Sequence, residues 1–302
     1  MTNTSPFFSV VIPTFNRLEY LREAIESVLS QTFEDFELIV VDDSPEETGR
    51  PVARSFSDAR LAYIKNDHSS GGAGTRNAGI ERARGKWVAF LDDDDIWLPE
   101  KLERQAEKIA ASDDNVALVY TGHTTFRQDS EHSYTFVPKK EGWIYKDLLA
   151  WNVIGGFYSV AIRRDVLNEV GGLDERFPAM QDAELYIRIA KKYKVACIPD
   201  PLVRVRDSLG NRITTNYANK LRASQLFQEK FKTDVGQDLY LKHRVASRIF
   251  MFAFAEGELG KLLKNAPLTL MGLGMERKSI ENTLRFMARV SLAKLKHKRG
   301  RP

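Results

Sequence analysis

The sequence predicts an α/β fold with a mostly parallel central sheet flanked by helices and a helical C-terminal extension. Short apolar strands alternate with one-faced helices over the first hundred or so residues, and only helical periodicity follows Asn219. Hydrophobic residues make up 43% of the 302 residues and charged residues 28%. These values exclude a disordered or low-complexity chain, and the length allows one large or two ordinary domains.

The first half of the chain repeats a strand and helix rhythm. We expect strands at 7–12, 36–41, 61–64 and 87–91. We also expect a helix at 18–31, a second helix that ends at about residue 57, and a third helix at 75–83 that follows a glycine-rich turn. Leu18, Leu21 and Ile25 recur at helical spacing, whereas Pro13 is expected to stop the first strand. Such β-α-β units predict parallel strands joined by right-handed crossovers.

The second half is less regular. We expect a helix at 101–112 with Pro99 at its first position, irregular strands over 116–137, a helix within 180–194, strands at 195–198 and 202–206, and helices beyond residue 219. Leu185 and Ile189 should share the buried face of the helix within 180–194.

Charge and cysteine content narrow the function classes. Lys and Arg number 45 against 41 Asp and Glu, a net charge of +4 that is too small for a general nucleic-acid coat. The single cysteine, Cys197, cannot form an internal disulfide and fits a reducing cytosol. Neither a signal peptide nor a transmembrane helix is expected, and the five histidines lack metal-ligand spacing.

Three expected strands end at polar turns, at 13–17, 42–44 and 92–95. In an open α/β sheet, ligands bind beyond the carboxyl ends of the strands. We therefore expect these turns to converge on one binding crevice.

Four adjacent carboxylates, Asp92 to Asp95, are the most informative feature. Each close pair repels by about 1 kcal/mol even in water, so the run calls for a compensating cation. Hard oxygen ligands suit Mg²⁺ or Mn²⁺, which complete their coordination with substrate phosphates. The alternative is a solvated acidic turn or helix cap, with Asp95 as the cap of the following helix.

Two further segments carry weaker signals. Asp42 and Asp43 could accept hydrogen bonds from a base or a ribose, or cap a turn. The segment 71–79 combines glycines with Arg76, which could hold a phosphate or order the acidic turns. It is neither a dinucleotide fingerprint nor a Walker loop.

Taken in order, the motifs VVIPTFNR, FELIVVDDS, GAGTRNAGIERARGKWVAFLDDDDIWLPEKL and MQDAELYIRIA resemble the inverting family 2 glycosyltransferases with a GT-A fold. The resemblance spans residues 7 to 215. It implies a nucleotide-diphosphate sugar donor, with a UDP-sugar expected, a Mn²⁺ or Mg²⁺ cofactor, and a sugar, lipid-linked or protein acceptor. It also implies a donor half at 1–115 and an acceptor half at 116–218. The helical pattern beyond Asn219 predicts a third, helical region at 219–302.

The resemblance assigns roles to individual residues. The implied nucleotide contacts are Pro13, Thr14, Asn16, Arg17, Asp42, Asp43, Arg76, Asp92 and Asp93, with Asp43 preferred over Asp42, and Asp94 is the implied metal ligand. Asp182 is the implied catalytic base, with a helix N-cap as its alternative, although Gln181 departs from the common Glu.

The acceptor side is less defined. Glu184 could bind acceptor hydroxyls, and Trp151 could stack on an acceptor sugar or serve in packing. Where many family members carry a His, this chain has Asp207 and Ser208, so Arg204, Arg206 or Arg212 are the substitutes considered for diphosphate contact.

The expected function is inverting sugar transfer in cell-surface polysaccharide or glycolipid synthesis, in the cytoplasm. A nucleotidyltransferase and a non-catalytic sugar-nucleotide-binding module are the alternatives. From Arg285 the chain is basic and amphipathic, which fits either a peripheral contact with the inner membrane face or a helix packed on the protein, and no nucleic-acid binding is expected.

Overall fold

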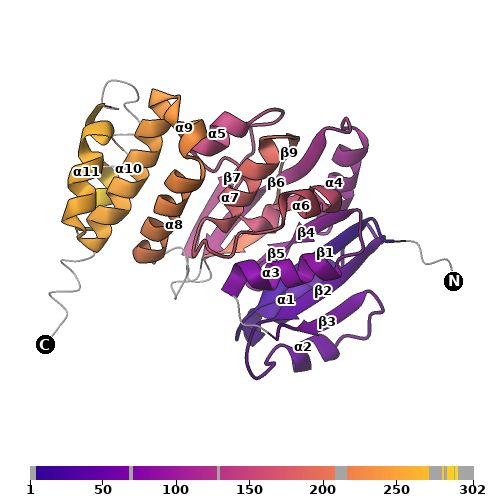
Figure 1. Ribbon diagram of the computed structural model, residues 1–302. Coiled ribbons are helices and arrows are strands. Elements are labelled where there is room, and N and C mark those ends of the chain that lie inside the picture. Colours follow the sequence, from indigo (N-terminus) through magenta and orange to yellow (C-terminus); the bar gives the residue numbers. More distant parts are fainter. Residues whose placement is uncertain are drawn as a thin grey trace, which may run out of the picture. The chain divides into compact units, whose positions relative to one another are not determined.

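A computed structural model describes residues 5–67, 71–127, 130–207, 216–271, 281, 284–288 and 290–291 (Figure 1). The chain forms two compact units. Unit 1 comprises Met1–Leu148, Asn152–Arg176 and Gln181–Gly210, and unit 2 comprises Leu149–Trp151, Phe177–Met180 and Asn211–Pro302.

Unit 1 is built on a nine-stranded sheet whose first part is parallel. The parallel strands lie in the order β3 (Leu61–Lys65), β2 (Phe36–Asp42), β1 (Phe8–Thr14) and β4 (Trp87–Phe90). The side chains of β1, β2 and β4 are almost all buried, as expected for strands that are covered on both faces, whereas those of β3, at the edge of the sheet, are partly exposed. The predicted α/β fold is confirmed.

Helices cover both faces of this parallel part. The helices are α1 (Leu18–Leu29), α2 (Arg50–Arg54) and α3 (Gly71–Arg82). Leu21 and Ile25 of α1 share a buried cluster with Val10 of β1. On the other face, a Cβ atom at Gly79 would lie 2.4 Å from Cγ1 of Val11. Only glycine at position 79 allows α3 to approach β1 so closely.

The second part of the sheet is mixed. It contains β8 (Val160–Arg163), β6 (Val116–Arg127), β9 (Lys194–Arg206), β5 (Ile96–Trp97) and β7 (Ser130–Phe136). β8 runs antiparallel to both β4 and β6, whereas β6 and β9 are parallel. The expected strands at 195–198 and 202–206 are one strand, β9.

Five further helical segments belong to this part of the chain. They are α4 (Lys101–Ala110), α5 (Tyr145–Ala150), the 3-10 turn η1 (Phe157–Ser159), α6 (Arg164–Val170) and α7 (Gln181–Ala190). Leu185 and Ile189 of α7 are both fully buried, which confirms the expected apolar face.

Three expectations about local boundaries are wrong. The glycine-rich segment expected as a turn is the first turn of α3, where the Thr75 hydroxyl and Arg76 Nη1 donate to the carbonyl oxygens of Gly71 and Gly72 at 2.8 Å and so offset the poor helix propensity of glycine. Pro13 lies inside β1, where it is tolerated because the pairing with β4 ends at Val11. The helix after Pro99 begins at Lys101 as expected, but Pro99 is not its first residue, because the N-cap position is Glu100.

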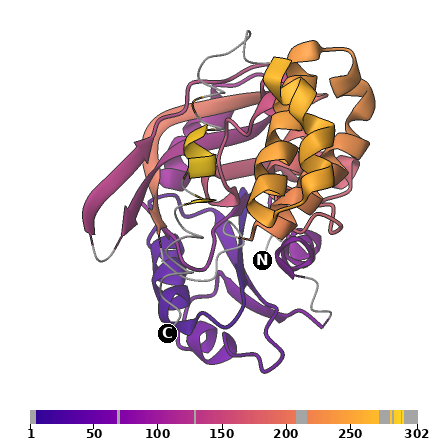
Figure 2. The ribbon, with the colours of Figure 1, turned by 90° about the vertical axis from the view of Figure 1, so that its left-hand side faces the viewer.

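Unit 2 is helical. It contains α8 (Tyr217–Lys230), α9 (Lys232–Gly236), α10 (Leu239–Glu256) and α11 (Leu259–Met271). The helices α10 and α11 pack side by side (Figure 2). In the described part of the tail, the Phe286 ring packs against Tyr217 and Phe252. Leu292 and Leu295 lie outside the described residues. Among the described residues, no helix is both long and apolar enough to cross a bilayer.

Lys101, at the start of α4, is fully buried. Its Nζ donates to Gln105 Oε1 at 2.9 Å and lies 3.7 Å from the centre of the Trp97 ring. The ring favours the charged form by about 2 kcal/mol, whereas desolvation of an ammonium costs several kcal/mol. Burial therefore lowers the pKa of Lys101 well below its usual value.

We expect this lysine to make stability depend on pH. In the unfolded chain Lys101 holds its proton up to about pH 10.4, but the folded protein releases that proton at a lower pH. Unfolding then takes up a proton, so the free energy of unfolding rises with pH between the two pKa values. Relative to Lys101→Met, the wild type should gain stability from pH 7 to about pH 10 in urea titrations. A parallel dependence in the two proteins would contradict this expectation.

Candidate active site

The turns after β1, β2 and β4 lie together in unit 1, as the sequence predicted. Thr14 Oγ1 donates to Asp93 Oδ2 at 2.8 Å, and the Phe15 amide lies 3.4 Å from the same oxygen. The amide of Asp43 donates to the carbonyl oxygen of Thr14 at 3.0 Å. Residues 29 to 79 positions apart therefore form one acidic edge at the carboxyl ends of the parallel strands.

Arg17 neutralises two of the carboxylates. Its Nη1 lies 2.6 Å from Asp94 Oδ2 and 3.4 Å from Asp93 Oδ1, while the side chain stays about 41% exposed. Burial raises the pKa of Asp93 to about 7, although Arg17 and Thr14 act in the opposite direction. The Arg17 guanidinium thus places a positive charge beside both carboxylates, which indicates that this edge of the sheet is arranged to bind positively charged groups.

Arg76 connects the acidic edge to the second half of unit 1. It forms an ion pair with Asp92, and its guanidinium carbon lies 4.6 Å from the centre of the Phe157 ring. Its Nη1 also donates to the carbonyl oxygen of Gly72 at 2.8 Å. Arg76 Nε is buried and has no hydrogen-bond partner among the described residues. Arg76 therefore orders the acidic turn, one of the two roles expected for it.

Asp42 and Asp43 differ in their surroundings. Asp42 accepts four hydrogen bonds, from the amide and hydroxyl of Ser44, the amide of Gly49 and the hydroxyl of Tyr63, at 2.6–2.9 Å. Asp43 accepts from Asn66 Nδ2 at 2.7 Å. Asp42 holds the loop after β2 together. Ligand contact by either residue stays a prediction.

Asp95 does not cap the following helix. Its Oδ1 accepts the amide of Arg206 at 2.9 Å, and Arg206 Nε donates to the carbonyl oxygen of Asp94 at 3.2 Å. Arg206 Nη2 also reaches Glu23 at 2.6 Å. The Arg206 side chain, which is almost fully buried, holds the acidic turn in place rather than offering itself to a diphosphate. Ser208 and Arg212 lie outside the described residues.

Asp182 is the second residue of α7 and is partly exposed. Its Oδ1 accepts the amide of Ala183 at 2.8 Å, and its Oδ2 accepts Asn152 Nδ2 at 3.1 Å. A helix cap would instead accept an amide two or three residues ahead, so the alternative N-cap role is wrong. Burial of the carboxyl raises the pKa of Asp182 to about 6, with the Ala183 amide and Arg76 opposing the shift and Asp92 adding to it. A carboxylate of this pKa suits general base catalysis near neutral pH.

Glu184 and Trp151 were the predicted acceptor contacts. Glu184 is fully buried, and its two carboxylate oxygens accept from Arg188 Nε and Nη2 at 2.6 and 2.7 Å. Acceptor contact by Glu184 stays a prediction, and it would require this ion pair to open. Trp151, in unit 2, is about half exposed, and the Arg244 guanidinium lies 5.4 Å from its ring. Its stacking role also stays a prediction.

The donor set suits a hard divalent cation. Within the described ranges, no three His, Cys, Asp or Glu side chains are grouped to hold a metal by themselves. The carboxylates at this edge can therefore supply only part of an octahedral shell. Mg²⁺ and Mn²⁺ accept such a site when water and substrate phosphate oxygens supply the remaining ligands.

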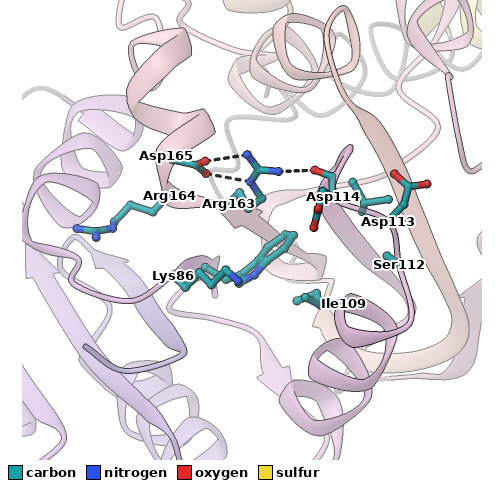
Figure 3. A pocket seen from close by; sticks show the side chains of 10 residues that line it. Lys86, Ile109, Ser112, Asp113, Asp114, Arg163, Arg164 and Asp165 are labelled. Carbon is teal, nitrogen blue, oxygen red and sulfur yellow. Dashed lines mark hydrogen bonds and ion pairs between the residues drawn. The ribbon is translucent and has the colours of Figure 1, made fainter. Parts of the chain in front are cut away.

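A cavity of about 490 Å³ lies at the other end of β4, around Trp87 and Lys86 (Figure 3). Arg163 points across it, pairs with both oxygens of Asp165 at 2.7–3.0 Å and donates to the carbonyl oxygen of Asp114 at 2.6 Å. None of the predicted site residues lines this cavity.

Comparisons with known proteins agree with this geometry. The sequence profile described as "Glycosyl transferase family 2" matches residues 9–171. TuaG of Bacillus subtilis (strain 168), a glycosyltransferase named for teichuronic acid biosynthesis, is 33% identical over 64% of this chain and 75% of its own length. WfgD of Escherichia coli, named as a UDP-Glc:alpha-D-GlcNAc-diphosphoundecaprenol beta-1,3-glucosyltransferase, is 31% identical over 63% of this chain and 72% of its own length.

Two solved structures share the fold. TarS of S. aureus (residues 1–349, in complex with UDP-GlcNAc) superposes with a TM-score of 0.68 at 18% identity, over 85% of this chain and 79% of its own. The mannosyltransferase PcManGT of Pyrobaculum calidifontis, in complex with GDP-Man and Mn²⁺, gives a TM-score of 0.59 at 20% identity, over 97% of this chain and 88% of its own.

Proposed function

Since the chain belongs to glycosyl transferase family 2, it is a glycosyltransferase, and we propose that it transfers a sugar from a UDP-sugar to an acceptor hydroxyl with inversion. The strongest support is the position of Arg76. This side chain pairs with Asp92 at the acidic edge, and its positive charge partly offsets the rise in the pKa of Asp182. The predicted donor site and the predicted catalytic base therefore share one charged neighbourhood.

On the donor side, the turn formed by Pro13, Thr14, Asn16 and Arg17 binds the nucleotide. Asp43 contacts the base or ribose, because the oxygens of Asp42 already hold the loop after β2. Asp92 and Asp93 lie beside the ribose and the diphosphate, and Arg76 keeps Asp92 in place. TarS was crystallised with UDP-GlcNAc, which supports a uridine donor here.

Asp94 holds the divalent cation, Mn²⁺ or Mg²⁺. PcManGT binds Mn²⁺ together with its sugar nucleotide, which supports this choice. When bound, the ion stabilises the negative charge of the departing diphosphate as a Lewis acid. The buried Arg206 keeps Asp94 in position through its backbone carbonyl.

Asp182 takes the proton from the acceptor hydroxyl as that oxygen attacks the anomeric carbon. A single base and a single displacement give inversion at that carbon. WfgD acts on a diphosphoundecaprenol-linked sugar and TuaG is named for teichuronic acid, so we place the reaction in cell-surface polysaccharide synthesis with a lipid-linked acceptor. With this assignment, we propose that the protein acts in the cytoplasm.

A donor panel tests the proposed function. The protein is incubated with Mn²⁺ and UDP-, GDP- or dTDP-sugars, and release of free sugar and nucleoside diphosphate is measured. We expect hydrolysis of at least one UDP-sugar that stops in EDTA. A nucleotidyltransferase would instead release pyrophosphate from nucleoside triphosphates, and a non-catalytic module would bind donors without releasing sugar.

Arg17 competes with the metal for Asp93 and Asp94 in the absence of donor. A partly exposed ion pair contributes up to about 1 kcal/mol, which corresponds to a roughly fivefold change in affinity. We therefore expect Arg17→Ala to bind Mn²⁺ alone about fivefold more tightly, measured from the free Mn²⁺ signal in electron paramagnetic resonance. Arg22→Ala, on the exposed side of α1, is the control and should bind like the wild type. Unchanged or weaker binding by Arg17→Ala would contradict the competition.

A further inference from the structure

Asn152 lies in the loop between α5 and η1, and its side chain joins this loop to α7. Its Oδ1 accepts the amides of Ile154 and Gly155 at 3.0 and 3.1 Å. Its Nδ2 donates to the carbonyl oxygen of Gly155 at 3.0 Å and to Asp182 Oδ2 at 3.1 Å.

These contacts fix which end of the amide faces the carboxylate. A flipped amide would place Nδ2 against two backbone donors and would lose both of those hydrogen bonds. The NH₂ group of Asn152 must therefore face Asp182. The loop cannot keep its present turn while presenting the amide oxygen to that carboxylate.

We propose that Asn152 is a positioning residue for sugar transfer, whose amide holds the Asp182 carboxylate in the orientation that receives the acceptor proton. The inference rests on the proposed role of Asp182. The Ala183 amide binds Oδ1 and Asn152 binds Oδ2, so donors from two different segments fix the carboxylate plane. A carboxylate offers about four lone-pair positions, and those left over remain for the acceptor hydroxyl.

The charged and titratable groups around Asp182 come from every neighbouring segment. Arg76 of α3 favours the ionised carboxylate, and Asp92 after β4 opposes it. Tyr158 of η1 and Tyr186 of α7 also interact electrostatically with Asp182. The tyrosines are neutral near pH 7 and therefore carry no charge that would stabilise the ionised Asp182 carboxylate. The Asn152 amide stabilises that ionised form by donating a hydrogen bond to it.

Asn152→Asp tests the positioning role while keeping two of the three hydrogen bonds that Asn152 makes within its loop, since only the bond to the Gly155 carbonyl oxygen is lost. Aspartate keeps an oxygen for the Ile154 and Gly155 amides, since Asn and Asp form the same kind of turn. The other oxygen replaces the NH₂ group opposite Asp182, so two carboxylates then compete for one proton. We expect the acid limb of kcat/KM to move about one pH unit upward, so that kcat/KM at pH 6.5 falls about threefold, with donor affinity unchanged.

The experiment measures pH profiles for hydrolysis of UDP-glucose or UDP-N-acetylglucosamine, whichever the wild type cleaves. Asn115→Asp, the same chemical change at an exposed position, is the control and should match the wild type. A carbon-13 NMR titration of the Asp182 carboxyl, assigned by its absence in Asp182→Asn, reports the same shift without turnover. Circular dichroism verifies that each variant is folded.

Two outcomes would overturn the inference, and they are distinguishable. If Asp182→Asn is inactive but Asn152→Asp keeps the wild-type pH profile and carboxyl titration, Asn152 has no positioning role and the proposed base stands. If Asp182→Asn retains full turnover, the catalytic base is misassigned and the inference fails with it.

Discussion

Asp182→Asn is expected to abolish sugar transfer while leaving donor binding unchanged. An amide cannot accept the proton that the acceptor hydroxyl loses, and a positioned general base contributes about 10²–10⁴-fold to a rate. The carboxylate accepts from Ala183 and Asn152, and the amide oxygen of the variant can keep one of these bonds. Calorimetry with UDP and Mn²⁺ together with a turnover assay separates binding from chemistry.

The pH profile gives the same prediction a second measurement. Burial raises the pKa of Asp182 to about 6, and a base must be ionised to act. The wild-type kcat/KM should therefore rise with pH through about 6 and level off above it. Asp35→Asn, an exposed carboxylate before β2, is the matched control and should behave as the wild type. Turnover by Asp182→Asn at the wild-type rate would end the assignment.

The sequence predicts the parallel part of the fold well because its evidence is local. Runs such as that of β2 are apolar throughout, and helices such as α1 show one apolar face, so element type follows from short segments. The meeting of Thr14 with Asp93 also follows, because parallel strands all present their carboxyl ends at one edge.

Contacts between distant segments are not predictable in this way. Arg206 holds the backbone of Asp94 from 112 positions away, and no local pattern marks that arginine as structural. Asn152 contacts Asp182 across 30 positions through a loop of little periodicity. The Asn-Val-Ile-Gly segment indicates a turn, but nothing in the segment predicts which carboxylate the Asn152 amide contacts.

Carboxylates near a candidate site can serve either ligand binding or the local structure, and their hydrogen bonds to the protein show the second role. Asp42 and Glu184 have the residue type expected at a binding site, yet protein donors engage both oxygens of each. Buried polar groups must find partners, so a carboxylate can be retained for the loop or helix that it holds. The identity of a residue alone therefore does not distinguish this structural role from ligand binding.

Asp94→Ala is expected to remove metal-dependent donor binding. The variant deletes the predicted metal ligand, and Arg17 is left with Asp93 as its partner in this turn. Because the described residues offer no group of three metal ligands, no neighbouring side chain is arranged to replace the lost oxygen. We expect UDP affinity in the presence of Mn²⁺ to fall about 100-fold, on the scale of other losses at metal sites.

The comparison with EDTA makes this prediction specific. In the wild type, EDTA should weaken UDP binding strongly, whereas in Asp94→Ala it should change little, because the metal contribution is already lost. Asp94→Asn keeps one oxygen and should lie between the two. The fold should survive, since Arg206 binds the main-chain carbonyl at this position and not the side chain. If Asp94→Ala bound UDP with wild-type affinity and the wild-type response to EDTA, the ion would have to bind elsewhere. The acidic turn would then serve structure alone, held by Arg17 and Arg76.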